Sequence, residues 1–100
     1  MNRRLLFIID SDPRSSRRPA EAVRIAAGIA AWRQVDVSLY FRGHAALALT
    51  EEAESLMDGD NFTRYLPVLR EAGARVLSGE RMSDAALAAL AAGQTSVARF

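Results

Sequence analysis

The first strongly apolar stretch of the chain covers residues 5–9, where five hydrophobic residues follow one another without interruption. A strand that is apolar at every position is buried on both faces, as in the centre of a parallel sheet covered by helices. The stretch stops at Asp10-Ser11-Asp12-Pro13, which are turn-forming residues. The pattern predicts an α/β fold with a polar turn at the carboxyl end of a central strand, where such sheets place their ligand sites.

The rest of the chain alternates between helical and strand-like patterns. Pro67 lies inside one helical stretch and should kink that helix or end it. The order of the elements favours a mainly parallel sheet of about four strands with helices on both faces. The expected elements are strands over 4–9, 35–41, 74–77 and 95–100, helices over 19–32, 62–72 and 84–92, a short helix or turn over 44–49, and an acidic surface stretch over 50–61.

The first predicted helix has an unusually wide apolar stripe. Ile25, Ile29 and Trp32 share a face with small alanines, and Val23 widens that face. A stripe of this width exceeds what one sheet face needs, and it indicates a further contact such as a second subunit.

Composition narrows the possible functions. The chain has 100 residues, half of them hydrophobic, which is typical of a single domain over 1–100. Its formal net charge of +1 does not indicate the strongly basic face of a nucleic-acid-binding protein. It contains no cysteine, which excludes disulfides, thiolate metal ligands and a thiol nucleophile. No signal-peptide pattern opens the chain, and no apolar stretch approaches the roughly 20 residues that cross a bilayer. We therefore expect a cytoplasmic protein that does not bind a membrane.

Polar side chains follow each predicted strand, and parallel strands bring those segments to one edge of the sheet. Arginines outnumber acids in this set, so a small anion is the expected ligand, held by charge-assisted hydrogen bonds near the start of the first helix. A solvated loop over 14–18 is the alternative explanation for its arginines. The candidate ligand-binding residues are Asp10, Ser11, Arg14, Ser16, Arg17, Arg42, His44, Ser78 and Glu80.

Metal and catalytic sites are less well supported at this edge. Asp10 and Asp12 could hold Mg²⁺, but the second strand ends in Arg42-Gly43-His44 and supplies no further acid, so turn chemistry explains both aspartates. His44, the only histidine, has no nucleophile beside it in a recognised pattern, and Ser78 forms no triad order with it. We predict no metal, no cofactor and no catalytic residue.

Several stretches together resemble the DsrE/DsrF-like (Tus-type sulfur-relay) family. The resemblance covers nearly the whole chain through loose hydrophobic patterns. The segments that carry it are Leu5-Leu6-Phe7-Ile8-Ile9-Asp10-Ser11, Ala22-Val23-Arg24-Ile25-Ala26, Val35-Asp36-Val37-Ser38-Leu39-Tyr40-Phe41-Arg42-Gly43, and Tyr65-Leu66-Pro67-Val68-Leu69-Arg70-Glu71-Ala72-Gly73-Ala74-Arg75-Val76.

The resemblance implies a small flavodoxin-like domain of three layers that assembles into homo- or hetero-oligomers. Active members of the family carry persulfide sulfur on a cysteine just after the third strand, and that position aligns with Gly79, give or take one residue. Neither Gly79 nor Ser78 can carry a persulfide, so sulfurtransferase activity is not expected. Some relay subunits lack the thiol and act as partners in the assembly.

Two functions follow as hypotheses. The first is a non-catalytic oligomeric subunit, a homotrimer or hexamer that can associate with other sulfur-relay subunits. The alternative is a protein or enzyme that binds a small anion or other small ligand in the polar pocket at the carboxyl edge, with His44 and Asp10 as working groups. The first needs an extensive apolar interface, whereas the second needs a concave pocket in which polar groups converge.

Overall fold

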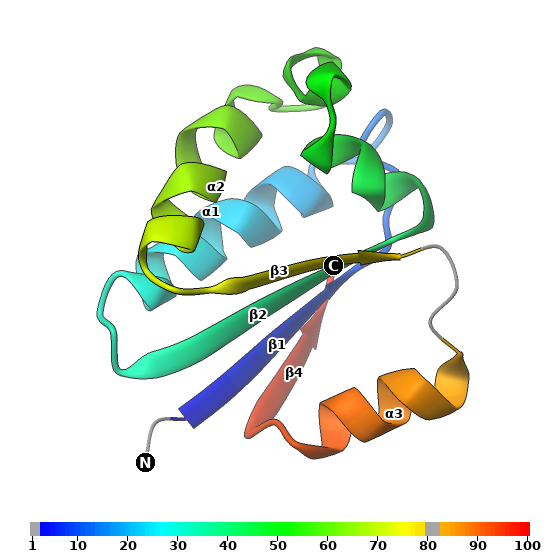
Figure 1. Ribbon diagram of the computed structural model, residues 1–100. Helices are drawn as coiled ribbons and strands as arrows, with labels where there is room; N and C mark the ends of the chain where they lie inside the picture. Colours follow the sequence, from blue (N-terminus) through cyan, green and yellow to red (C-terminus); the bar gives the residue numbers. More distant parts are fainter. Residues whose placement is uncertain (1–2, 80–82) are drawn as a thin grey trace.

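The protein folds into three layers, with helices on both sides of one parallel sheet (Figure 1). The computed structural model describes residues 3–79 and 83–100. All strand pairs are parallel, and the spatial order of the strands is β3-β2-β1-β4. The strands are β1 Arg3–Ile9, β2 Val35–Arg42, β3 Arg75–Gly79 and β4 Ser96–Arg99.

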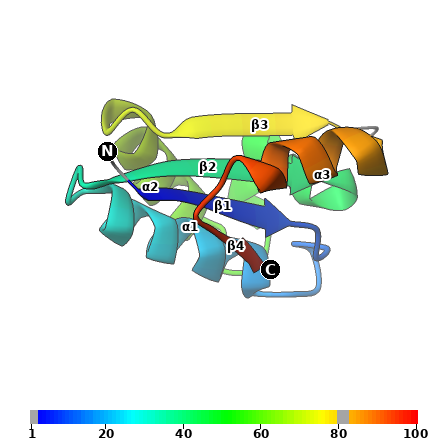
Figure 2. The ribbon, with the colours of Figure 1, turned by 90° about the horizontal axis from the view of Figure 1, so that it is seen from below.

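The two faces of the sheet are covered unequally. Helices α1 (Arg18–Ala30) and α2 (Asp60–Glu71) lie side by side on one face, whereas α3 (Asp84–Ala92) is the helix on the other (Figure 1). Seen from below, α3 lies in front of the arrowhead half of the sheet (Figure 2). Two 3₁₀ helices, η1 (Gly43–Leu49) and η2 (Glu51–Ser55), connect β2 to α2. One of them lies in the predicted acidic surface stretch, so that stretch is more ordered than its loop signals indicated.

The predicted central strand is confirmed. β1 lies between β2 and β4, and Leu6 and Ile8 are 0% and 4% exposed. Alternate side chains of β1 point to opposite faces, so Phe7 and Ile9 pack under α1 and α2 while Leu6 and Ile8 pack under α3. An unbroken apolar run is what a strand covered on both sides requires.

The hydrophobic core is therefore divided into a large part and a small part. On the α1 and α2 side, Leu39 and Phe41 of β2 join buried alanines of α1 and Phe62 of α2. On the other side, Leu6, Ile8 and Tyr40 are packed by Leu77 and by the leucines of α3, Leu87 and Leu90. The smaller core covers only the carboxyl half of that face, because α3 is nine residues long.

Several helix ends agree with the sequence signals, whereas the expectations for Pro67 and for the end of α1 need correction. The Ser83 hydroxyl accepts a hydrogen bond from the N–H of Ala86 at 3.1 Å and caps α3 as predicted. Gly73, with φ +84°, follows the end of α2 and leads the chain into β3. The prediction that Pro67 could end its helix is wrong, because α2 continues through it to Glu71. Pro67 is exposed, so water can reach the carbonyl group that its missing N–H leaves without a helical partner.

The wide stripe of α1 is only partly covered. Its alanines and Val23 are buried against the sheet and α2, whereas Ile25 is 36% exposed. The helix ends at Ala30, two residues earlier than predicted, and Trp32 in the following turn is 74% exposed. Arg33 then adopts φ +57° and turns the chain toward β2. One subunit therefore leaves part of the predicted apolar stripe in contact with solvent.

Candidate functional site

The strand register brings the predicted polar segments to one edge of the sheet. Ile9 at the end of β1 is level with Phe41, and Phe41 is in turn level with Ser78 of β3. The next residue of β2, Arg42, is level with Gly79. The segments that follow β1 and β2 therefore start at the same edge as the end of β3 (Figure 1).

Three arginines at this edge are paired with carboxylates. Arg14 lies 2.8 Å from Asp12, measured between guanidinium nitrogen and carboxylate oxygen. The other two pairs are longer, Arg99–Asp10 at 3.6 Å and Arg17–Asp58 at 3.7 Å, and all six side chains are at least one-third exposed. Exposed pairs of this kind stabilise the fold only weakly. Their main effect at this edge is to neutralise guanidinium charge that a free anion would otherwise meet.

Asp12 carries the strongest electrostatic shift of the edge. Hydrogen bonds from the Arg14 side chain and from the Arg14 backbone N–H lower the pKa of the Asp12 carboxyl to about 2, and the nearby charges of Arg14 and His44 act in the same direction. Asp12 is therefore a carboxylate throughout the physiological range. Its attachment to Arg14 also shows that the first part of the arginine loop is held by local contacts.

The two predicted serines of the loop make structural hydrogen bonds. The Ser11 hydroxyl donates to the carbonyl oxygen of Phe100, and the Ser16 hydroxyl oxygen accepts from the N–H of Arg18 at 3.2 Å at the start of α1. Arg18 in turn donates to the carbonyl of Arg99 at 3.0 Å, and its guanidinium lies 5.6 Å from the centre of the Phe100 ring. These contacts connect the loop to the end of β4.

The remaining candidates are divided between the two faces of the sheet. Arg42 has the same parity in β2 as Tyr40, which faces α3, whereas Ser78 lies on the α1 side of β3. His44, which is exposed, is the second residue of η1 and lines a hollow of about 470 Å³ with Gly43, Ala46, Leu47 and Thr50. Glu80 lies outside the described residues. The predicted segments therefore lie at one edge of the sheet, but their side chains do not all point into one pocket.

Two groups of residues were missed by the sequence reasoning. Asp58 and Arg99 complete ion pairs at the carboxyl edge, and no local motif marked either of them. A second polar group lies at the opposite, amino-terminal end of the sheet and consists of Arg4, Asp36, Ser38 and Arg75. The strand alternation could have grouped them. Each lies an even number of residues from Leu6, Tyr40 or Leu77 on its own strand, and those side chains face α3.

Residues 3–79 and 83–100 contain no group of three or more histidine, aspartate or glutamate side chains placed to hold a metal ion. In the same ranges, no helix has the length and apolar character that crossing a membrane requires.

Comparison with known proteins identifies the fold. No family model matches the chain, and no curated protein matches it. Among solved structures, the crystal structure of the ychN protein from E. coli, a DsrE/DsrF-like protein, superposes over 100% of both chains with a TM-score of 0.78 and 16% sequence identity. The fold is therefore DsrE/DsrF-like. This match confirms the predicted α/β class, with its four-stranded parallel sheet.

In this DsrE/DsrF-like fold, Gly79 is the last residue of β3. The Tyr40 hydroxyl donates to the Gly79 carbonyl at 3.1 Å and fixes the strand end from the α3 side. A Cβ atom built on Gly79 would lie 3.7 Å from the Tyr40 hydroxyl oxygen, which is an ordinary contact distance. Gly79, which the sequence resemblance predicts to align with the family's cysteine to within one residue, therefore has room for a side chain, although this sequence places none there.

Proposed function

We propose that the chain is a non-catalytic DsrE/DsrF-like subunit that acts in the cytoplasm by assembling with further copies of itself, as a trimer or hexamer, and with other sulfur-relay subunits. The observation that carries the proposal is the complete absence of cysteine, with Gly79 at the position aligned with the sulfur carrier. In persulfide chemistry the thiolate is both the nucleophile and the carrier. A chain without a thiol can contribute binding surface to such an assembly but cannot carry its sulfur.

An exposed apolar surface supports the assembly part of the proposal. Ile25, Ile29 and Trp32 are spaced four and three residues apart, so they lie along one side of α1 and the turn that follows. Trp32 and Ile29 line a groove of about 260 Å³ with Leu5 of β1 and the beginning of β4. β4 is an edge strand, so one of its sides has no neighbouring strand in the described sheet. We call Ile25, Ile29 and Trp32, together with the adjoining start of β4, the α1/β4 surface, and we propose that a second copy covers it.

Incubation with a persulfide donor tests the non-catalytic part of the proposal. The intact mass of the wild-type protein should stay unchanged, because no side chain can form a stable persulfide. Gly79→Cys is the matched variant, and it should gain the mass of one sulfur atom because the space beside Tyr40 accommodates its Cβ. A stable sulfur adduct on the wild-type chain would overturn the proposal.

A second candidate function is anion binding at the carboxyl edge. It is favoured by Arg18 and Arg42, which lie at this edge outside the three arginine–carboxylate pairs found there among the described residues. Each charge-assisted hydrogen bond to an anion contributes roughly 1.5–3 kcal/mol. Arg18→Gln or Arg42→Gln should therefore weaken binding about tenfold or more in an isothermal titration with sulfate. Sulfate affinity equal to that of the wild-type protein in both variants would exclude this site.

A further inference from the structure

The face of the sheet that α3 covers is apolar at one end and polar at the other. Leu6, Ile8 and Tyr40 occupy its carboxyl half under α3. In the amino half, the same strand positions carry polar residues: Arg4 is level with Asp36, and Ser38 is level with Arg75. Because side chains alternate along a strand, all four point to the α3 side. The chain thus places a polar group on three adjacent strands where its short helix does not reach.

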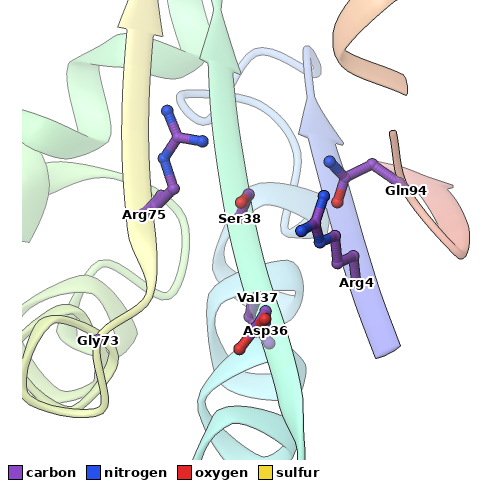
Figure 3. Close-up of a pocket in the computed structure, with 7 residues that line it drawn as sticks. All are labelled: Arg4, Asp36, Val37, Ser38, Gly73, Arg75 and Gln94. Atoms are coloured by element: carbon purple, nitrogen blue, oxygen red, sulfur yellow. The ribbon is translucent and has the colours of Figure 1, made fainter. Parts of the chain in front are cut away.

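These residues enclose a hollow of about 310 Å³, which is within the size range of small-ligand sites. Ser38 forms its floor and is 7% exposed, the one polar side chain in the buried core of the described residues. Gln94, in the turn after α3, points toward Arg4 and closes one side (Figure 3). Its amide nitrogen donates to the carbonyl oxygen of Leu90 at 3.3 Å, which holds this wall in place.

The hollow carries more positive than negative charge. Two guanidinium groups, those of Arg4 and Arg75, face it together with one carboxylate, that of Asp36. The ion pairs found in the described part of the chain include neither arginine, in contrast to Arg14, Arg17 and Arg99 at the carboxyl edge. An anion that enters the hollow therefore does not have to displace a carboxylate from either guanidinium.

The positions of the two arginines suit one small ligand. Arg4 and Arg75 lie on the strands to either side of β2, so their backbones are separated across the sheet by two strand spacings, or about 10 Å. Both side chains lean toward β2, where Ser38 lies between them (Figure 3). Asp36 lies nearer the amino end of β2 (Figure 3). Donors on two sides and a hydroxyl below match an ion that accepts hydrogen bonds in several directions.

We propose that this hollow binds a small tetrahedral oxyanion of the phosphate or sulfate class. Arg4 and Arg75 donate charge-assisted hydrogen bonds from opposite sides, and the Ser38 hydroxyl donates from the floor. Asp36 leaves one net positive charge in the hollow. This site is separate from the carboxyl edge and does not depend on the assembly role proposed above.

Titration of ¹⁵N-labelled protein with inorganic phosphate at constant ionic strength tests the proposal. Saturable shifts should appear at Arg4, Ser38, Gly73 and Arg75 and be absent from the arginine loop over 14–18. Arg75→Gln should weaken binding about tenfold or more, because it removes one charged donor from an exposed side chain. Ser38→Ala should weaken it less, because the hydroxyl is an uncharged donor.

Two matched variants serve as controls. Arg3→Gln removes an equal charge one residue away on the opposite face of β1, and Arg24→Gln removes one on α1; both should bind phosphate as the wild type does. Equal weakening by Arg3→Gln and Arg75→Gln would overturn the proposal, because it would indicate attraction by net charge alone. Shifts confined to the carboxyl edge and abolished by Arg42→Gln would also overturn it, in favour of the other anion site. Absence of saturable shifts would overturn it as well.

Discussion

Asp12 holds the first part of the arginine loop, because it accepts hydrogen bonds from both the side chain and the backbone N–H of Arg14. These bonds favour its charged form and lower its pKa from 3.8 to about 2. A carboxyl whose pKa is lower in the folded state stabilises the fold above its unfolded pKa. That contribution is lost as the pH falls from about 4 toward 2.

A ¹³C titration of the Asp12 carboxyl carbon should therefore give a midpoint near pH 2 in the wild-type protein. In Arg14→Gln the midpoint should rise toward 3.8, because the largest cause of the shift is removed. Arg24→Gln is the control, since Arg24 pairs with Glu21 and not with Asp12. A wild-type midpoint near 3.8 would mean that Arg14 does not hold the carboxylate.

Gly59 is a second residue whose identity is fixed by its surroundings. A Cβ atom at this position would lie 2.2 Å from the carbonyl oxygen of Ala53 and 2.7 Å from that of Glu54, and both contacts are with backbone. Gly59→Ala should lower the free energy of unfolding by about 1–3 kcal/mol, as measured by urea denaturation. Gly28→Ala is the control, because its Cβ would meet nothing within 4 Å and alanine favours the helix. A Gly59→Ala variant as stable as the wild type would contradict the close packing of η2 against the start of α2.

At the scale of elements, α1 has a buried side and an exposed side with different tasks. The alanines and Val23 allow close packing against the sheet and α2, whereas Ile25 and Trp32 remain exposed. Single exposed hydrophobic residues are ordinary on protein surfaces. A tryptophan that is 74% exposed beside an apolar groove and an edge strand is what an interface supplies.

Trp32→Gln should therefore weaken self-association and leave the fold of the subunit intact. We expect a lower average mass at equal concentration in sedimentation velocity, with an unchanged far-UV circular dichroism spectrum. Val68→Gln is the matched control, because Val68 is 40% exposed on α2, away from the α1/β4 surface. Dissociation by Val68→Gln with no effect of Trp32→Gln would place the interface on α2 and contradict the proposed surface.

At the scale of the whole molecule, the fold could be predicted from the sequence because its central strand is unambiguous. The run over 5–9 required helices on both faces, and the alternation over 35–41 gave the large core its second strand. Pro67 was predicted to kink its helix or end it, and it does not end it, because it lies on an exposed helix face where water can replace the missing partner.

The candidate site could be predicted only in outline. The parallel topology placed the strand-following segments at one edge, but the partners Asp58 and Arg99 come from distant segments that no local pattern connects to Arg17 and Asp10. The polar hollow at the other end was missed for a different reason. The sequence signals had placed function at the carboxyl edge. No local pattern showed that α3 does not extend over the amino half of its sheet face, where Ser38 and its polar neighbours lie.

The central claim is that this chain, which has a DsrE/DsrF-like fold, works by assembling. Sedimentation velocity of the wild-type protein at micromolar concentration tests it most directly. The account predicts a species of three or six times the chain mass of 10.9 kDa, because one subunit leaves the α1/β4 surface exposed. A single species of 10.9 kDa at that concentration would contradict it.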